Sequence, residues 1–287
     1  MRIPAGRVAW RSQQARMHEM KKYWTGEALY GDDFGPQQME EWYRDEQAAY
    51  YELTFSTYGH YEYAYHALNW RHAYSKLPGD FFASCLAFGC ATGDDVAPLA
   101  PRVAEFVCVE PDERFWRSAL GGKRARFLKP SPSGALPIAT GCVDLIVCLG
   151  VLHHIPNVSF VVGEFARVLT PEGWLVLREP VSSMGDWRKP RPGLTKRERG
   201  IPLDYLRECL RGTGLVVVSE ALCAFPLVPR LAKLMRVRHA YNSRALVWLD
   251  QFMSRLMRWN ISYHRDSLLK KLAPSEVFVV ATKRAGT

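Results

Sequence analysis

The chain has 287 residues, enough for one large domain with additions or for two small ones. Hydrophobic residues make up 48% of it, which is ordinary for a globular protein that buries a full core. The net charge of +9 favours acidic partners, namely a phosphate-bearing substrate, nucleic acid or an anionic membrane surface. Many plain soluble enzymes are equally basic, so the charge alone does not choose among these.

The seven cysteines and the N-terminus bear on the cellular compartment. The cysteine count is odd, most of them lie in apolar runs, and no pair has the spacing of metal ligands. We therefore expect free thiols in a reducing cytosol, without disulfides and without a metal site. The basic N-terminal segment lacks the apolar stretch of a secretory signal, and no run of about eighteen apolar residues occurs. These features predict a cytoplasmic protein.

The chain divides into four regions. Residues 1–80 are aromatic and partly helical and are predicted to form an N-terminal lid. Residues 81–225 alternate apolar strands with polar helices and form the predicted core. Residues 226–272 are basic and helical, and residues 273–287 hold the last strand and the tail.

Seven strands and three helices are predicted from the apolar patterns. The strands are Ala83–Phe88, Phe106–Val109, Ala125–Leu128, Val143–Leu149, Trp174–Arg178, Leu215–Ser219 and Val277–Ala281, and the helices of the core are Asp95–Ala100, Glu113–Leu120 and Val158–Leu169. Apolar strands separated by crossover helices indicate a parallel sheet that is covered on both faces. The handedness of such crossovers predicts a doubly wound, Rossmann-like α/β sheet.

A turn rich in small residues follows the first strand. It reads Gly89-Cys90-Ala91-Thr92-Gly93, and a predicted helix begins beyond it. Small residues let the backbone turn sharply and approach a ligand closely, and a helix N-terminus adds unpaired amides. Glu110 ends the next strand, where a carboxylate can accept hydrogen bonds from both hydroxyls of an adenosine ribose. NAD would also suit a site made of this turn and Glu110. The alternative interpretation is that the turn is purely structural and that Glu110 is an exposed acid at a strand end.

Two adjacent histidines, His153 and His154, follow the fourth strand. Ligands in open α/β sheets bind beyond the carboxyl ends of the strands, so these imidazoles are expected near the turn at Gly89. One of them could accept a proton near neutral pH. The alternative is that both only pack the pocket wall.

Taken together, these segments resemble the class I S-adenosylmethionine-dependent methyltransferases, in particular the branch with a type 11 methyltransferase domain. The segments that match the family pattern are Leu86–Gly93, Val109-Glu110-Pro111, Val143–Val147, Leu152–Pro156 and Arg167–Leu177. The resemblance implies a seven-stranded sheet in the order 3-2-1-4-5-7-6 whose last strand is antiparallel. It also implies S-adenosylmethionine as the cofactor.

The resemblance implies roles by position as well. Gly89, Cys90, Ala91, Thr92 and Gly93 would contact the methionine part of the cofactor, Glu110 with Pro111 the ribose, Ser131 the adenine, and Leu149 with Gly150 the floor of the site. His154 would face the methyl group, with His153 behind it. The sequence departs from the family pattern at Ala87, where an acid is usual, and at Ala91, where glycine is usual.

The turn after the fourth strand also bears on the acceptor. It lacks the Asn/Asp-Pro-Pro-aromatic motif of enzymes that methylate nucleobase nitrogens, so no nucleic acid is expected. An imidazole base suits a hydroxyl acceptor better, and its help would be worth about 10²–10⁴-fold in rate.

The loop after the fifth strand interleaves Ser, Asp, Trp and Arg with Gly and Pro. Arginines there could grip phosphate and Trp187 could stack on a sugar, while the alternative is a solvated basic loop. The loop resembles that of methyltransferases from bacterial surface-polysaccharide gene clusters. This resemblance implies a glycan or phosphorylated sugar acceptor, such as a lipopolysaccharide O-chain, and the residues expected to contact it are Ser182, Asp186, Trp187, Arg188, Arg191, Arg197, Arg199 and His264.

The region from 226 to 272 combines basic residues with apolar residues at helical spacing. It could cap the acceptor cleft, form a dimer interface or lie on anionic lipid at the inner membrane, where polysaccharide-assembly proteins would be partners. For the whole chain, the sequence favours an O-methyltransferase of surface glycans. A methyltransferase of small molecules or natural products and a non-catalytic cofactor-binding protein are the alternatives.

Overall fold

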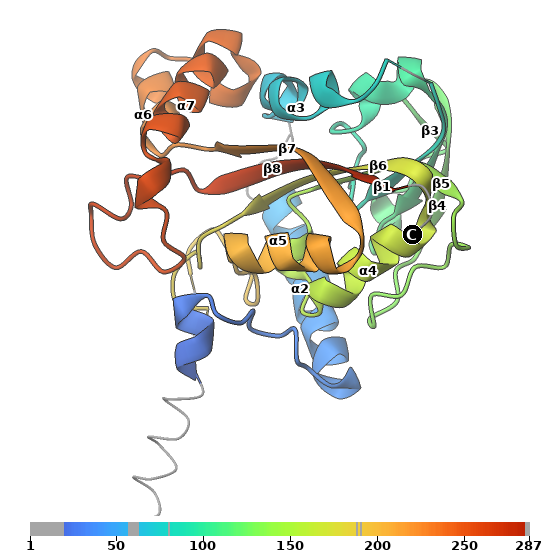
Figure 1. Cartoon of the computed structure of the whole chain (residues 1–287), viewed down its shortest axis with the longest axis horizontal. Coiled ribbons are helices and arrows are strands. Elements are labelled where there is room, and N and C mark those ends of the chain that lie inside the picture. The colour runs from blue at the N-terminus through green and yellow to red at the C-terminus, as the bar shows by residue number, and fades with distance from the viewer. Residues whose placement is uncertain (1–19, 57–62, 80, 188, 190, 285–287) are drawn as a thin grey trace, which may run out of the picture.

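A mixed eight-stranded sheet forms the centre of the molecule in this computed structural model, which describes residues 20–56, 63–79, 81–187, 189 and 191–284 (Figure 1). The strands are β1 (Phe82–Phe88), β2 (Val103–Val109), β3 (Ala119–Leu120), β4 (Lys123–Leu128), β5 (Val143–Leu149), β6 (Leu169–Pro180), β7 (Leu215–Cys223) and β8 (Glu276–Lys283). Their order is β3-β4-β2-β1-β5-β6-β8-β7. Strand β8 is antiparallel to both of its neighbours, as expected for the last strand.

The expected count of seven strands is wrong because of the two-residue strand β3. It pairs antiparallel with β4 through Gly121 and Gly122, whose φ angles are +53° and +80°. Two consecutive residues with positive φ form the tight hairpin turn that glycine pairs favour. Without β3, the other seven strands follow the expected order 3-2-1-4-5-7-6.

The sheet separates two hydrophobic clusters because successive side chains of a strand point to opposite faces. In β1, Cys85 and Ala87 belong to one cluster, and Leu86 and Phe88 belong to the other. The first cluster packs under α3 (His66–His72), α6 (Leu227–Leu234) and α7 (Arg244–Leu256). The second packs under α4 (Val158–Val168) and α5 (Leu203–Gly212), as Figure 1 shows.

Two expected helices are shorter or different in kind. The helix expected over Asp95–Ala100 is a 3₁₀ helix, η2, over Ala97–Arg102, and it contains Pro101, which lacks the amide that an α-helix interior needs. The helix expected over Glu113–Leu120 is one 3₁₀ turn, η3 (Glu113–Phe115), followed by β3. The remaining short 3₁₀ helices are η1 (Tyr74–Lys76), η4 (Leu152–His154), η5 (Ala240–Asn242) and η6 (Arg258–Asn260).

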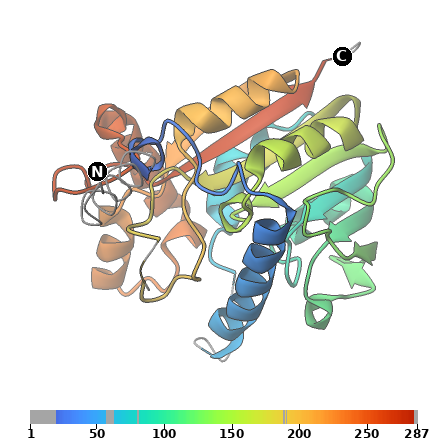
Figure 2. The same ribbon diagram turned by 90° about the horizontal axis from the view of Figure 1, so that it is seen from below.

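The N-terminal region contributes two helices that lie in different parts of the fold. Helix α2 (Pro36–Ser56) projects from one end of the sheet, and α3 packs on a sheet face (Figures 1 and 2). Residues 20–25 are also helical. Parts of the expected lid, residues 1–19 and 57–62, lie outside the described residues. Within the described part of the chain, no helix combines the length and apolar character needed to cross a membrane.

Candidate functional site

The register of the parallel strands gathers the expected cofactor residues at one edge of the sheet. Phe88 pairs with Val109, and Val109 pairs with Leu128. The residues that follow these pairs, Gly89 and Glu110, therefore leave adjacent strand ends side by side. On the other side of β1, strands β5 and β6 end together, because Leu149 pairs with Arg178. This is the edge at which open α/β sheets bind ligands.

Glu110 is tied to the small-residue turn. Its carboxylate accepts a hydrogen bond from the amide of Ala91 at 2.9 Å and one from the amide of Asp112 at 3.1 Å. The Glu110 side chain is buried, and burial raises its pKa to about 7, although the two amides favour the charged form. The turn itself needs unusual backbone conformations: Gly89 has φ +65°, and a side chain there would meet Val151 at 2.5 Å.

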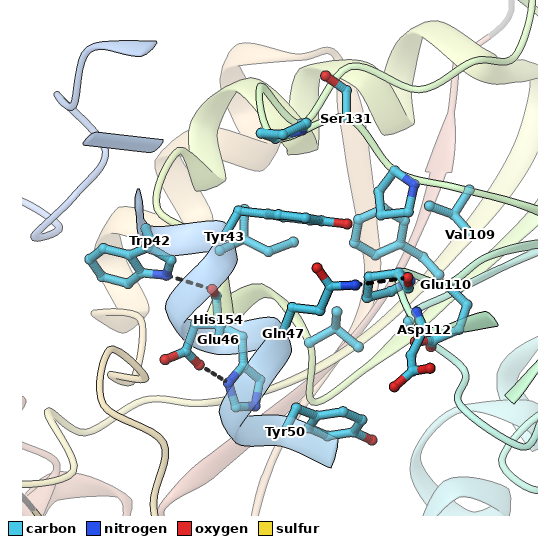
Figure 3. A pocket seen from close by; sticks show the side chains of 18 of the residues that line it. Trp42, Tyr43, Glu46, Gln47, Tyr50, Val109, Glu110, Asp112, Ser131 and His154 are labelled. Carbon is cyan, nitrogen blue, oxygen red and sulfur yellow. Dashed lines mark hydrogen bonds and ion pairs between the residues drawn. The ribbon is translucent and has the colours of Figure 1, made fainter. Parts of the chain in front are cut away.

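A pocket opens beside this turn, and Figure 3 shows the side chains around it. Its cavity volume is about 130 Å³, less than the roughly 300–1,000 Å³ of typical small-molecule sites. One wall is formed by α2 and the others by the strand ends and the turns that follow them. Of the residues expected at the cofactor, those that line the pocket are Gly89, Glu110, Pro111, Ser131 and Gly150.

The other expected cofactor residues support the pocket from outside its wall. Cys90 and Leu149 are buried in the hydrophobic cluster that packs under α3. Thr92 donates a hydrogen bond to Asp94 at 2.6 Å, and Gly93 approaches Leu120. Ala91 adopts φ +44° and presents its amide to Glu110, so an alanine does fit this tight turn.

One polar group in the wall of this pocket lacks a partner and suits an adenosyl ligand. The hydroxyl of Tyr43 is buried without a hydrogen-bond partner among the described residues, and it lies in the pocket wall on α2. Burial, reinforced by the charge of Glu110, raises the pKa of Tyr43, so this hydroxyl stays protonated. A buried polar group without a partner costs free energy that a ligand can recover. Ribose hydroxyls are suitable partners for Glu110 and Tyr43.

At the other end of the pocket, His154 pairs with an acid from α2. Nδ1 of His154 lies 2.7 Å from Oε2 of Glu46, and the side chain of Glu46 is buried (Figure 3). Thr195 Oγ1 lies 2.5 Å from the same carboxylate oxygen, and Oε1 of Glu46 accepts the amide of Arg197 at 2.7 Å. The indole of Trp42 donates to the backbone carbonyl of His154 at 2.7 Å. Helix α2 thus fixes both the ring and the backbone of His154.

The protonation of this pair follows from its surroundings. Burial disfavours the charged form of His154, but the hydrogen bond and charge of Glu46 outweigh burial and raise the pKa of His154. Burial likewise disfavours the charged form of Glu46, but the hydrogen bond to His154 outweighs it and lowers the pKa of Glu46. The two side chains therefore form an ion pair at lower pH. The neutral imidazole that can act as a base forms as the pH rises through the raised pKa of His154.

His153 turns away from the pocket and organises the turn behind it. Its Nδ1 lies 2.8 Å from Glu179, which is fully buried at the end of β6. Glu179 also accepts the backbone amides of Val151, Leu152 and His153 at 2.8–3.2 Å. These bonds hold the η4 turn that presents His154. His153, His154 and Glu198 bring potential metal-ligand atoms within 4.8 Å of one another, but all three side chains make hydrogen bonds or ion pairs inside the protein.

Two residues expected to contact the acceptor lie in the interior. The guanidinium of Arg199 is fully buried and donates to the backbone carbonyls of Tyr30, His153 and Pro156 at 2.8–3.0 Å. It joins the N-terminal segment to the η4 turn and does not face an acceptor. The ring of Trp187 is mostly buried and stacks on Trp24 at 4.4 Å and on Tyr30 at 5.5 Å.

A second cavity, here called the basic cavity, lies beside Thr195. Its cavity volume is about 560 Å³, and the residues that line it are Tyr30, Trp187, Lys189, Arg191, Leu194, Thr195, Lys196 and Arg197. Three of the expected acceptor residues, Trp187, Arg191 and Arg197, are therefore brought together here. Arg191 also donates to the carbonyls of Met184, Thr195 and Glu198, and Arg197 pairs with Asp45 of α2.

The remaining expected acceptor residues are more dispersed. Ser182 is half-buried, and its carbonyl lies against Gly200. Asp186 lies 4.0 Å from Lys189, and His264 lies 2.9 Å from the hydroxyl of Ser183. None of Ser182, Asp186 and His264 lines the pocket beside Glu110 or the basic cavity. Arg188 lies outside the described residues.

The sequence interpretation missed the contribution of α2. Trp42, Tyr43, Glu46, Gln47 and Tyr50 line the pocket, at the spacing i, i+1, i+4, i+5 and i+8 that places residues on one face of a helix. That spacing was a usable signal for a shared face. It gave no sign that Glu46 would reach His154, because the two residues are 108 positions apart.

The central part of the chain is similar in sequence to known proteins. Residues 86–177 match the family described as a methyltransferase domain. An uncharacterized methyltransferase of Mycobacterium sp. (strain JLS) is 32% identical over 109 residues, which is 38% of this chain and 42% of that protein. A human thiol S-methyltransferase is 29% identical over 107 residues, 35% of this chain and 43% of that protein. The matched segments thus span less than half the length of these relatives.

The fold is shared with solved structures as well. A crystal structure of an S-adenosylmethionine-dependent methyltransferase from Listeria monocytogenes superimposes with a TM-score of 0.52 and covers 76% of this chain and 98% of its own. At 14% identity this likeness concerns the fold alone. The strand order, the turn that binds Glu110 and the match over residues 86–177 agree with one another. Residues 86–177 therefore match a methyltransferase domain, and they lie in a sheet whose fold is shared with an S-adenosylmethionine-dependent methyltransferase.

Proposed function

We propose that the protein is an S-adenosylmethionine-dependent O-methyltransferase that acts on a hydroxyl of a bacterial surface glycan or of a phosphorylated sugar. The observation that carries the proposal is the Glu46–His154 pair at one end of a pocket whose other end holds Glu110. The first group can accept a proton, and the second can hold a ribose. A sugar hydroxyl needs such a base, because it loses its proton when it becomes a methyl ether.

In this proposal the bound cofactor supplies an electrophilic methyl group on a sulfonium. Glu110 accepts hydrogen bonds from the ribose hydroxyls, and Tyr43 provides a further polar contact. His154 receives the proton of the acceptor hydroxyl on its second ring nitrogen while Nδ1 stays bonded to Glu46. The acceptor oxygen would gain this methyl group, and the cofactor would leave as S-adenosylhomocysteine. Most of the rate enhancement would come from positioning, with the base adding about 10²–10⁴-fold.

The basic cavity supports an anionic acceptor. Lys189, Arg191, Lys196 and Arg197 line it, and Thr195 joins it to the Glu46–His154 pair. Two of these cations also pair with Asp45, so part of their charge is already compensated. Guanidinium groups suit phosphate and carboxylate because their donors match two oxygens at once. We propose that a phosphate or carboxylate of the acceptor occupies this cavity.

A second candidate is methylation of a small molecule, including a thiol. Two observations favour it: a relative is a human thiol S-methyltransferase, and the pocket is walled mainly by aromatic and apolar side chains such as Trp42, Tyr50 and Phe88. The imidazole of His154 would deprotonate a thiol more readily than a hydroxyl, because a thiol is the stronger acid. A protein that binds the cofactor without catalysis is the third possibility.

The test is methyl transfer from labelled S-adenosylmethionine to a panel of acceptors, namely phosphorylated oligosaccharides, neutral oligosaccharides, and small alcohols and thiols. We expect label in the phosphorylated sugars and little in the neutral ones. Label only in thiols or small alcohols would replace the first candidate by the second. Tight binding of S-adenosylhomocysteine with no transfer to any acceptor would favour the non-catalytic protein.

A further inference from the structure

Exposed apolar side chains gather in one region that the methyltransferase site does not use. Helices α6 and α7 lie between β7 and β8 in the chain and form one corner of the molecule (Figure 1). Nine of the fourteen large apolar residues that are exposed in the described structure belong to residues 227–269. They are Leu227, Leu234, Met235, Trp248, Phe252, Leu256, Trp259, Leu268 and Leu269.

The outer face of α7 carries the densest part of this surface. Trp248, Phe252 and Leu256 recur every four residues, and they are 61%, 62% and 57% exposed. Residues four apart lie above one another on a helix, so these three side chains form one stripe. The opposite face is buried, with Leu246 and Val247 packed against the sheet cluster. Helix α7 therefore has one face packed against the protein and an apolar stripe on the other, which is exposed.

Two further tryptophans extend the stripe beyond α7. Trp70 of α3 is 51% exposed and lines the same surface cavity as Trp248, with the guanidinium of Arg71 4.3 Å from the Trp248 ring. Trp259 follows the C-terminal end of α7 and is 69% exposed. We call the surface formed by Trp70, Trp248, Phe252, Leu256 and Trp259 the tryptophan face.

The exposed charge of the region that carries most of the tryptophan face, residues 227–271, is mainly positive. Residues 227–271 contain ten lysines and arginines, of which eight are exposed: Arg230, Lys233, Arg236, Arg238, Arg244, Arg255, Arg258 and Lys271. The region holds two acids. Asp250 is buried and accepts the amides of Ala224 and Phe225, and Asp266 pairs with Lys270. The exposed surface of this region is therefore strongly cationic.

We propose that the tryptophan face docks on an anionic phospholipid bilayer. Tryptophan, phenylalanine and leucine on one helix face, flanked by arginine and lysine, are the composition of helices that lie in the plane of a membrane surface. Tryptophan rings favour the level of the lipid headgroups. The exposed cations would face acidic headgroups. A second copy of the chain fits less well, because it would bring the same cations against each other and because the cores of protein interfaces are depleted of charge.

The experiment is co-sedimentation of the full chain with two kinds of vesicle, one of phosphatidylcholine alone and one of equal parts phosphatidylcholine and phosphatidylglycerol. We expect binding to the anionic vesicles, and we expect it to weaken in about 0.5 M sodium chloride because salt screens the charges. The variant Trp248→Ser/Phe252→Ser should bind about a hundredfold more weakly. The variant Arg255→Gln/Arg258→Gln should lose roughly thirtyfold, about fivefold for each charge.

The matched control is Phe160→Ser, which removes an apolar side chain that is 48% exposed on α4, under the opposite face of the sheet. Its binding to vesicles should equal that of the wild type, and all variants should keep the melting temperature and the affinity for S-adenosylhomocysteine. Equal binding to both kinds of vesicle, or undiminished binding by the Trp248→Ser/Phe252→Ser variant, would overturn the proposal. So would a wild-type dimer that ignores vesicles and becomes a monomer in that variant.

Discussion

The two ends of the pocket are held in different ways. At the cofactor end, Glu110 is fixed by backbone amides of neighbouring strand ends, which belong to the rigid parallel sheet. At the other end, His154 is fixed by the Glu46 side chain of α2 and by Thr195 of the loop after β6. The Glu110 carboxylate is therefore held by the sheet, whereas the His154 imidazole also requires α2 to be docked. Cofactor affinity and turnover should be separable by substitution.

The largest separation is expected for His154→Ala. Loss of the base should lower turnover by about 10²–10⁴-fold, because the acceptor then has to lose its proton to water. Affinity for S-adenosylhomocysteine should change little, because Glu110 and the turn at Gly89 remain. Turnover in the methyl-transfer assay and affinity by calorimetry measure the two effects. Turnover near that of the wild type would remove His154 as the base.

The opposite pattern is expected for Glu110→Ala. The loss of hydrogen bonds to a charged group should weaken cofactor binding by about 10–100-fold. Calorimetric titration measures this, with Glu113→Gln, an exposed acid three residues away, as the control. In the wild type, affinity should fall as the pH is lowered through about 7, the raised pKa of Glu110, because the carboxylate loses its charge. Unchanged affinity in Glu110→Ala would refute the ribose role.

A smaller effect is expected for Glu46→Gln, which keeps the shape of the side chain but removes its charge. We expect turnover to drop by about tenfold, since the imidazole becomes a weaker base. The pH profile gives a sharper readout. Neutral His154 is the active form, so turnover of the wild type should rise with pH through the raised pKa of His154. Without the charge of Glu46 this pKa falls, and the rise should move to lower pH.

Asp45→Asn is the matched control for Glu46→Gln. Asp45 also joins α2 to the loop after β6, through Lys196 and Arg197, but it makes no bond to His154. The pH profile of Asp45→Asn should keep its position even if weaker docking of α2 lowers its turnover. A shift of equal size in both variants would mean that Glu46 acts only by docking α2.

The smallest effect is expected for Ala91→Gly. Ala91 has φ +44°, a left-handed conformation that costs a residue with a side chain roughly 1–2 kcal/mol. Glycine adopts this conformation freely but loses more entropy on folding. The net gain in the free energy of unfolding should be at most about 1 kcal/mol, measured by urea denaturation. A clear loss of stability would show that the methyl group of Ala91 packs usefully.

The sequence predicted the cofactor end because its signals are local. Each apolar strand, the turn at Gly89 and the acid at Glu110 can be recognised within a few residues, and the topology of parallel sheets brings them together. The prediction of an α-helix after the turn was wrong, because the effect of Pro101 was overlooked. The strand β3 was missed although Gly121-Gly122 is a hairpin signal.

The catalytic end could be predicted only in part. His154 was identified from its place after a strand, but its partner Glu46 comes from a helix far away in the sequence. The loop after β6 was misleading in a different way. Its arginines suggested a ligand surface, yet the guanidinium of Arg199 is buried among backbone carbonyls. The pattern of charged residues in the sequence does not show which of them are buried. An arginine that is buried against backbone carbonyls and an arginine on the surface can stand in similar local sequences.

A crystal structure of the protein with S-adenosylhomocysteine tests the central claim most directly. We expect the ribose hydroxyls on Glu110 and the sulfur at the end of the pocket that faces His154, with the Glu46–His154 bond intact. A ligand bound elsewhere, or bound here with its sulfur directed away from His154, would contradict the account.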